Sequence, residues 1–108
     1  MDQQMYGELV QGILIALKDR VLRIVLYGST ARGDNSPDSD IDIAVFVQSQ
    51  LDREAEDSLS DFIVDLNLKY EKVFTVIDID NDIYSKWKDV MPFYKNLERE
   101  GIELWKAA

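Results

Sequence analysis

Two apolar segments joined by a glycine-containing stretch constrain the fold of this chain more than any other feature. Residues 22–27 and 41–47 are rich in β-branched and apolar side chains, which is typical of mostly buried strands. Gly28 directly follows the first segment, and glycine adopts backbone angles that are closed to other residues. Ser29 begins a predicted short helix, and a polar turn at residues 35–37 leads to the second segment. The sequence therefore predicts two strands that are connected by a tight turn and a short helix.

Apolar residues at helical spacing and short β-branched segments alternate along the rest of the chain. The remaining predicted elements are, in chain order, a helix at 3–19, a helix at 55–70, a strand at 73–79, a helix near 81–90, a helix from Pro92 to before Gly101 and a strand at 102–105. This order predicts an α/β (α+β) fold in which helices pack mainly on one side of a small mixed β-sheet. We expect residues 1–108 to form a single domain.

The charge balance restricts the partners of the chain. It has 21 acidic and 12 basic residues and a formal net charge of −9, so most of its surface would repel a long nucleic-acid backbone. No apolar run reaches the roughly 18 residues that a membrane span requires, the start of the chain lacks the basic residues of a signal peptide, and cysteine is absent. We expect a cytoplasmic protein that binds neither nucleic acid directly nor a membrane. Its acidic surface would suit a basic protein partner.

Asp40 and Asp42 stand two residues apart where the second strand begins. Side chains alternate along a strand, so both carboxylates project from one face, with Cα atoms roughly 6.5 Å apart. Mg²⁺ prefers such oxygen ligands and completes its shell with water and substrate phosphates. The hydroxyl of Ser29 and the free N–H groups at the start of the short helix point to where a triphosphate could lie. The pattern indicates phosphoryl or nucleotidyl transfer, and the alternative is an ordinary acidic turn before an edge strand.

The motif as a whole resembles a known family. It consists of Gly28-Ser29, ten intervening residues that include Ala31-Arg32-Gly33 and Ser39, and then Asp40-x-Asp42. This pattern resembles the signature of the minimal nucleotidyltransferases of the DNA polymerase β superfamily. The closing segment from Pro92 to Ile102 resembles the usual end of these domains, so the resemblance covers nearly the whole chain.

The resemblance implies a polymerase β-like nucleotidyltransferase core. Members of the family transfer a nucleoside monophosphate from a nucleoside triphosphate to a hydroxyl group. Many small members are encoded beside a HEPN-domain ribonuclease toxin and act as its antitoxin, some of them by adding AMP to a toxin tyrosine. A minimal nucleotidyltransferase of this toxin–antitoxin type is therefore what the resemblance implies for this chain.

The resemblance also assigns roles to individual residues. Asp40 and Asp42 are the implied catalytic residues and metal ligands. The implied nucleotide-binding residues are Gly28, Ser29, Arg32, Gly33 and Ser39. The implied cofactor is Mg²⁺, the substrate is ATP or another nucleoside triphosphate, and the partner is a HEPN-domain protein that offers the acceptor hydroxyl. The sequence leaves the base, the acceptor and a homo- or hetero-oligomeric state open.

Several of these side chains also have structural explanations. Arg32 can contact a phosphate or pair with Asp34 or Asp38. Ser39 either fixes the Asp40 carboxylate or shapes the turn, and the turn is the better explanation. The aromatic residues are assigned to the core or to a partner surface rather than to base stacking. Those near the C-terminus form a candidate docking patch of Phe93, Tyr94 and Trp105.

The third predicted strand departs from the family pattern. The superfamily normally carries a third carboxylate on this strand, and Thr75 occupies the matching position. Asp78 and Asp80 lie further along, roughly 10 Å from the carboxylate pair if the two strands run parallel. The chain has no histidine that could replace the missing base.

Three functional hypotheses follow. The first is Mg²⁺-dependent transfer of NMP, foremost AMP from ATP, to a protein hydroxyl, as the antitoxin of a HEPN ribonuclease toxin. The second is a catalytically weak or inactive antitoxin of the same fold that acts by binding its partner. The third is an interaction domain that binds no nucleotide.

Overall fold

The computed structural model describes residues 2–108 of the chain. In chain order, the helices are α1 (Gln3–Leu17), α2 (Gly28–Arg32), α3 (Arg53–Tyr70), α4 (Asn81–Trp87) and α5 (Pro92–Glu100), with a 3-10 turn η1 (Lys18–Arg20) after α1. The strands are β1 (Val21–Tyr27), β2 (Ile41–Val47), β3 (Phe74–Asp80) and β4 (Ile102–Lys106). Every predicted element is present, and the predicted and observed ends differ by at most three residues.

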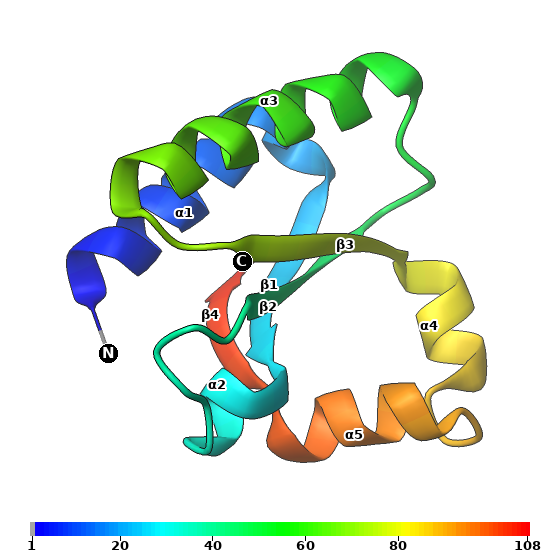
Figure 1. The fold of residues 1–108 in the computed structure, drawn as a ribbon. Helices are drawn as coiled ribbons and strands as arrows, with labels where there is room; N and C mark the ends of the chain where they lie inside the picture. The colour runs from blue at the N-terminus through cyan, green and yellow to red at the C-terminus, as the bar shows by residue number, and fades with distance from the viewer. Residues whose placement is uncertain (1) are drawn as a thin grey trace.

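The four strands form one mixed sheet in the order β3-β2-β1-β4 (Figure 1). β1 is antiparallel to β2 and to β4, whereas β2 and β3 are parallel. A parallel pair requires a crossover connection, which α3 supplies. The register places Asp42 of β2 opposite Tyr27 of β1 and opposite Thr75 of β3. Side chains from three adjacent strands therefore meet at one end of the sheet.

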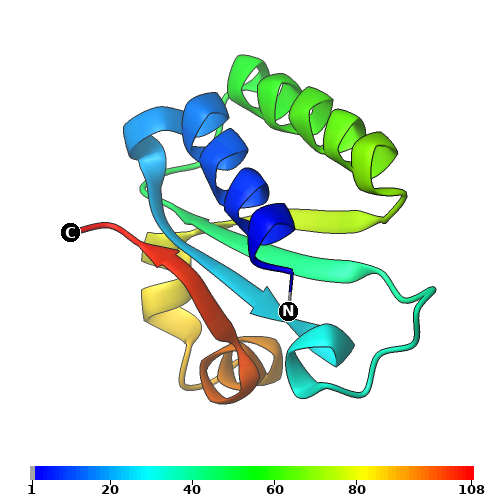
Figure 2. The ribbon, with the colours of Figure 1, turned by 90° about the vertical axis from the view of Figure 1, so that its left-hand side faces the viewer.

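Helices cover both faces of this sheet, so the fold has three layers. Figure 2 shows α1 and α3 on one face and α4 and α5 on the opposite face. The prediction that helices pack mainly on one side of the sheet holds for the two longest helices, α1 and α3. The shorter helices α4 and α5 cover the other side and bury a second apolar cluster there. Its buried members are Val25, Ala44, Phe46, Ile79, Tyr84 and Leu97.

The two-sided cover has a cause in the sequence of β2. After Asp42, this strand is apolar at every position from Ile43 to Val47, rather than at alternate positions. A strand of this kind buries both of its faces and therefore needs a layer on each side. The mixed sheet agrees with the prediction. The continuous apolar run of β2 explains why α4 and α5 cover the face opposite α1 and α3.

The two long helices begin at aspartate caps. Oδ1 of Asp2 accepts a hydrogen bond from the N–H of Met5 at 3.0 Å, and Oδ1 of Asp52 accepts one from the N–H of Ala55 at 2.8 Å. Each cap satisfies an N–H group that has no partner within its helix. Within residues 2–108, the helices lack the length and apolar character that crossing a membrane requires.

Candidate functional site

Gly28 holds the turn between β1 and α2 against the aspartate pair. Its φ is 74°, in the left-handed region that favours glycine. A Cβ atom built on Gly28 would overlap Oδ2 of Asp42. The turn can therefore approach the start of β2 because residue 28 has no side chain, and the structure brings the two predicted halves of the motif together.

Gly33 closes the short helix that begins at Gly28. It caps the C-terminal end of α2 with a φ of 80°, and its N–H donates to the carbonyl oxygen of Thr30 at 3.3 Å. The N–H of Asp34 donates to the carbonyl oxygen of Ser29 at 3.1 Å. Ser29 thus lies in the first turn of α2, next to Gly28, where the sequence predicts it.

Asp40 and Asp42 lie together at the start of β2. Burial raises the pKa of the Asp42 carboxyl, and the nearby charge of Asp40 raises it further. By strand alternation, Asp42 shares a face with Ala44 and Phe46, which is the face that α4 and α5 cover. Two carboxylates that repel one another on a partly buried surface create a place where a cation is stabilising.

Thr75 completes this group from β3. It pairs with Asp42 in the parallel register, and its Oγ1 donates to Oδ2 of Asp40 at 3.3 Å. Asp78 and Asp80 pair with Val45 and Val47, well away from the carboxylates. The structure therefore places a hydroxyl at the matching position on β3, as the sequence predicts.

The two carboxylates suit Mg²⁺, which takes part of its ligands from water and substrate. They are too few for a metal that is bound by protein side chains alone. Within residues 2–108, no group of three or more His, Cys, Asp or Glu side chains is arranged to hold a metal ion. Mg²⁺ commonly binds through one or two carboxylates and fills its remaining positions with water and substrate phosphates. Asp40 and Asp42 supply that number, so the two residues fit the predicted ion.

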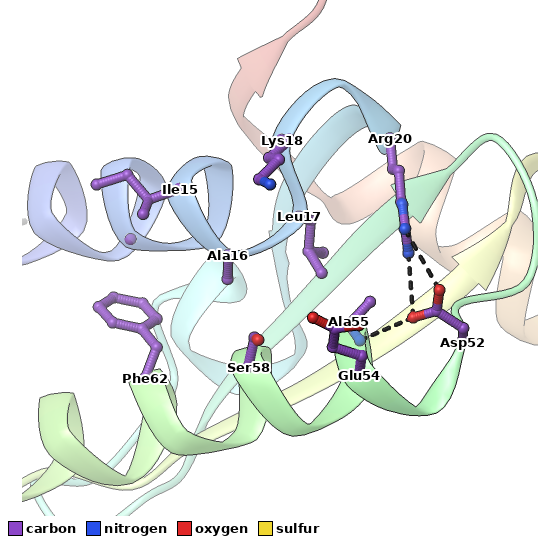
Figure 3. Close-up of a pocket in the computed structure, with 11 residues that line it drawn as sticks. Ile15, Ala16, Leu17, Lys18, Arg20, Asp52, Glu54, Ala55, Ser58 and Phe62 are labelled. Atoms are coloured by element: carbon purple, nitrogen blue, oxygen red, sulfur yellow. Dashed lines mark hydrogen bonds and ion pairs between the residues drawn. The ribbon is translucent and has the colours of Figure 1, made fainter.

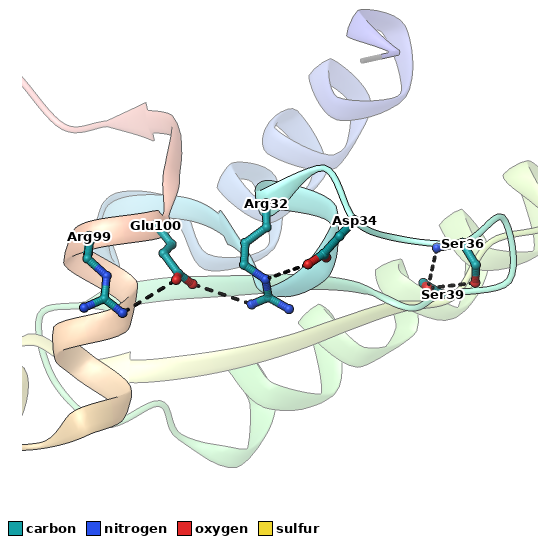
Figure 4. Close-up of polar contacts among 6 residues, drawn as sticks. All are labelled: Arg32, Asp34, Ser36, Ser39, Arg99 and Glu100. Carbon is teal, nitrogen blue, oxygen red and sulfur yellow. Dashed lines mark hydrogen bonds and ion pairs between the residues drawn. The ribbon is translucent and has the colours of Figure 1, made fainter.

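Arg32 pairs with acidic side chains other than Asp40 and Asp42 (Figure 4). Its Nε lies 3.2 Å from Oδ2 of Asp34, and one terminal nitrogen lies 3.5 Å from Oε2 of Glu100. Glu100 also pairs with Arg99 at 3.6 Å. The structure shows the pairing with Asp34, not with Asp38, and adds a link from α2 to α5 that the sequence did not reveal.

Ser39 shapes the turn before β2 (Figure 4). Its Oγ accepts a hydrogen bond from the N–H of Ser36 at 3.0 Å and lies 3.0 Å from the Ser36 hydroxyl. These contacts match the structural explanation of Ser39. Binding of a nucleotide by Arg32 or Ser39 stays a prediction.

The aromatic side chains of Tyr27 and Phe93 lie beside Asp42. The sequence predicts other roles for both residues. Tyr27 lies opposite Asp42 in the register of β1 and β2, and burial, together with the charge of Asp42, raises its pKa. The ring of Phe93 packs edge-on against Tyr27, with centroids 5.6 Å apart. The signal in the sequence is the position of Tyr27, which immediately precedes Gly28 on the face that carries the carboxylates.

The predicted docking patch of aromatic residues does not form as one surface. Trp105 packs against the cluster beneath α1 and α3, whereas Tyr94 packs against the cluster on the opposite face. Strand β4 and helix α5 therefore direct these side chains to different faces of the sheet. Of the three residues, Phe93 is the one that packs against Tyr27, which lies opposite Asp42.

A cleft of about 700 Å³ lies between α1 and α3 (Figure 3). Its charged residues include Arg20 and Asp52, whose side chains already pair at 3.4 Å. The rest of the lining consists of residues of α1 and α3, with Lys18, Glu54 and Phe62 among them. Because Lys18 and Arg20 precede β1 and Gly28 follows it, the cleft lies at the other end of β1 from the carboxylates and is not the candidate site.

Comparison with known proteins agrees with this geometry. A model of the nucleotidyltransferase domain family matches residues 10–104. A Methanocaldococcus jannaschii protein named "Putative protein adenylyltransferase MJ0604" is 30% identical over 104 residues, which cover 96% of this chain and 98% of that protein. A second protein of that organism, named "Putative protein adenylyltransferase MJ0141", is 29% identical over 97 residues, covering 90% and 92% of the two chains.

Solved structures of toxin–antitoxin complexes share the fold. One, determined with AMP-PNP, has a TM-score of 0.64 at 20% identity and matches 94% of this chain and 73% of its own. Another holds a tri-AMPylated Shewanella oneidensis HEPN toxin with an MNT antitoxin. Its TM-score is 0.60 at 19% identity, with 99% and 74% of the two chains covered.

The family match runs through α2 and β2 and so includes the glycine turn and the aspartate pair. It confirms the resemblance that the sequence motif indicates. This chain belongs to the nucleotidyltransferase domain family.

Proposed function

We propose that this protein is a Mg²⁺-dependent nucleotidyltransferase that transfers NMP, foremost AMP from ATP, to a hydroxyl of a protein partner. The observation that carries the proposal is the close approach of the Gly28 turn to Asp42, with Asp40 and Thr75 beside it. This arrangement supports phosphate binding and metal binding within one small site. The names of the two archaeal relatives support a protein as the acceptor.

Each part of the site has a role in this reaction. Asp40 and Asp42 would hold Mg²⁺, which neutralises charge on the phosphate under attack when it is bound. The N–H groups at the Gly28–Ser29 turn would bind phosphate oxygens, because residue 28 carries no side chain to block them. The acceptor oxygen forms a bond to the α-phosphorus, the bond to pyrophosphate breaks, and the hydroxyl proton passes to water.

We further propose that the partner is a HEPN-domain toxin and that this chain is its antitoxin. Structures of the same fold are toxin–antitoxin complexes, and one of them contains an AMPylated HEPN toxin. The net charge of −9 supports a protein partner over a nucleic acid. In this proposal, one domain of residues 1–108 acts in the cytoplasm.

Transfer of a labelled nucleotide tests the catalytic claim. Purified protein is incubated with α-labelled ATP, Mg²⁺ and the product of the adjacent gene, and label on that protein is counted. We expect Asp42→Asn to reduce the label at least about a hundredfold, since it removes one of two metal ligands. Asp78→Asn is the matched control, because Asp78 lies on the same sheet beside α3 and away from the site. Absence of label with the unmodified protein, or equal label with Asp42→Asn, would refute catalysis.

A second candidate function is an antitoxin that acts by binding alone. The observation that favours it is Thr75, which offers a hydroxyl where the family carries a carboxylate. This function predicts that a double Asp40→Asn, Asp42→Asn variant still binds the partner and fully inhibits it. Loss of inhibition with binding retained would exclude it.

A further inference from the structure

Apolar side chains gather on the outer surface of α4, of the turn after it and of the start of α5. Half of the ten large apolar side chains that are exposed in residues 2–108 lie within residues 83–93, each with 42–64% of its surface exposed. We call this group the α4–α5 patch, and its members are Ile83, Trp87, Val90, Met91 and Phe93. Ile83, Trp87 and Met91, together with Tyr94, line a hollow of about 300 Å³. Monomeric proteins rarely leave apolar side chains gathered in this way without a binding role.

The charge around the patch differs from that of the rest of the molecule. Residues 81–99 contain four basic and three acidic side chains, while the remaining residues contain eight basic and eighteen acidic ones. Lys86, Lys88 and Lys95 belong to this segment and form no ion pair within the described residues. The Nζ atom of Lys86 lies 5.5 Å from the centre of the Trp87 ring. Asp82 and Asp89 of the same segment form no ion pair in residues 2–108 either, so the segment carries a net charge of +1 (four basic minus three acidic) on an otherwise acidic protein.

The patch is continuous with the candidate site. Phe93 belongs to the patch and packs against Tyr27, and Tyr27 lies opposite Asp42. Helix α5, which carries Phe93, runs beside α2, which carries the glycine turn (Figure 1). A protein that covers the patch would thus contact Phe93, whose neighbour Tyr27 lies beside Asp42.

We propose that the α4–α5 patch docks the acceptor protein through a segment in which large apolar side chains are flanked by Asp or Glu. This inference rests on the proposed function, since it takes the acceptor to be a protein. The apolar anchors would fill the hollow beside Trp87 and Met91, and the acidic flanks would pair with the three lysines. An acceptor hydroxyl next to this segment would then lie beside Asp42. A nucleic acid offers negative charge without such anchors and does not match the patch.

Two synthetic helical peptides test this chemistry directly. Both carry leucines at positions i, i+3, i+4 and i+7, and they differ only in having glutamates or lysines at the flanking positions. Binding of each fluorescent peptide to the full chain is measured by anisotropy, without nucleotide. We expect the glutamate peptide to bind about tenfold more tightly than the lysine peptide. A triple Lys86→Glu, Lys88→Glu, Lys95→Glu variant should reverse this preference.

Paired variants separate the patch from other exposed apolar residues. A double Trp87→Ser, Met91→Ser variant should weaken binding of the glutamate peptide about tenfold. A double Ile15→Ser, Leu68→Ser variant is the control, because these residues are 75% and 74% exposed on α1 and α3. It should bind like the unmodified protein. Circular dichroism of each variant establishes that it is folded.

Three outcomes would overturn the proposal. The first is equal binding of the two peptides, and the second is unchanged binding by the folded Trp87→Ser, Met91→Ser variant. The third is a sedimentation result in which the unmodified protein self-associates and this variant is a monomer. The last result would assign the patch to a second copy of the chain. Failure of the unmodified protein to bind Mg-ATP in a calorimetric titration would instead count against the proposed function. The peptide assay contains no nucleotide, so the two failures are distinguishable.

Discussion

At the scale of single residues, the candidate site is a place where the folded chain holds an unfavourable charge. Burial and the neighbouring Asp40 raise the pKa of Asp42. In the unfolded chain, this carboxyl ionises near its ordinary value of 3.8, whereas in the folded chain it ionises at a higher pH. The ionised group therefore destabilises the fold, and the free energy of unfolding falls as the pH rises from 3.8 through the folded pKa.

Asp42→Asn should remove this penalty. At neutral pH, we expect the variant to have a free energy of unfolding about 0.5–2 kcal/mol higher than that of the unmodified protein, in the absence of Mg²⁺. The gain should shrink as the pH is lowered through the folded pKa and vanish below pH 3.8. Urea denaturation across this pH range measures the difference. A variant that is no more stable at pH 7, or a gain that grows on acidification, would contradict the account.

Gly28→Ala should damage the site through two separate effects. The φ of 74° strains any residue with a side chain, and the new methyl group would overlap Oδ2 of Asp42. We expect the variant to lose about 1–3 kcal/mol of stability and most of its nucleotide transfer. Gly33→Ala is the matched control, because Gly33 has a φ of 80° but a Cβ atom added to it would meet no atom within 4 Å. It shares the backbone strain without the overlap, so an equal loss of stability in both variants would exclude an effect of the overlap with Asp42.

At the scale of helices and strands, α5 links the site to the rest of the fold. Leu97 is buried in the second apolar cluster, and Glu98 accepts a hydrogen bond from the hydroxyl of Tyr84 on α4. Oε1 of Glu98 also lies 3.3 Å from a terminal nitrogen of Arg23 on β1. Through these contacts, α5 holds Phe93 against Tyr27 and Glu100 against Arg32.

Leu97→Ala should loosen this helix. Removing a buried leucine side chain leaves a cavity, and we expect the free energy of unfolding to fall by about 2–5 kcal/mol. Leu68→Ala on α3 is the control, since Leu68 is 74% exposed and its removal should change stability by about 0.5 kcal/mol or less. Urea denaturation compares the two variants. Equal effects would show that α5 is not packed as described.

At the scale of the whole molecule, the sequence predicts the elements better than their arrangement. Residues 41–47 are apolar enough to be recognised as a buried strand, and Asp40 and Asp42 stand two apart, so the strand and its shared face are readable from the chain. The strand order cannot be read from the chain, because β1 also pairs with β4, which lies at the far end of the sequence. The same holds for the contact between Arg32 and Glu100, which depends on where α5 comes to lie.

The candidate site divides in the same way. The approach of Gly28 to Asp42 follows from a local motif, and so does the position of Thr75 once β3 is aligned with the family pattern. The proximity of Phe93 depends on packing between α5 and β1, which no local pattern encodes. Local sequence therefore specifies the glycine turn and the aspartate pair, whereas long-range packing determines which side chains lie next to them.

The central place of β2 in the sheet also protects the site against misassembly. If β2 slipped by one residue against its neighbours, Asp42 would turn toward the apolar side chains of α1 and Ile43 would turn outward. Such a slip buries a carboxylate without a partner, which is far less stable than the observed register. The apolar core therefore selects the register of β2. The register that is most stable is also the one that places both aspartates on the side of the sheet that carries the candidate site.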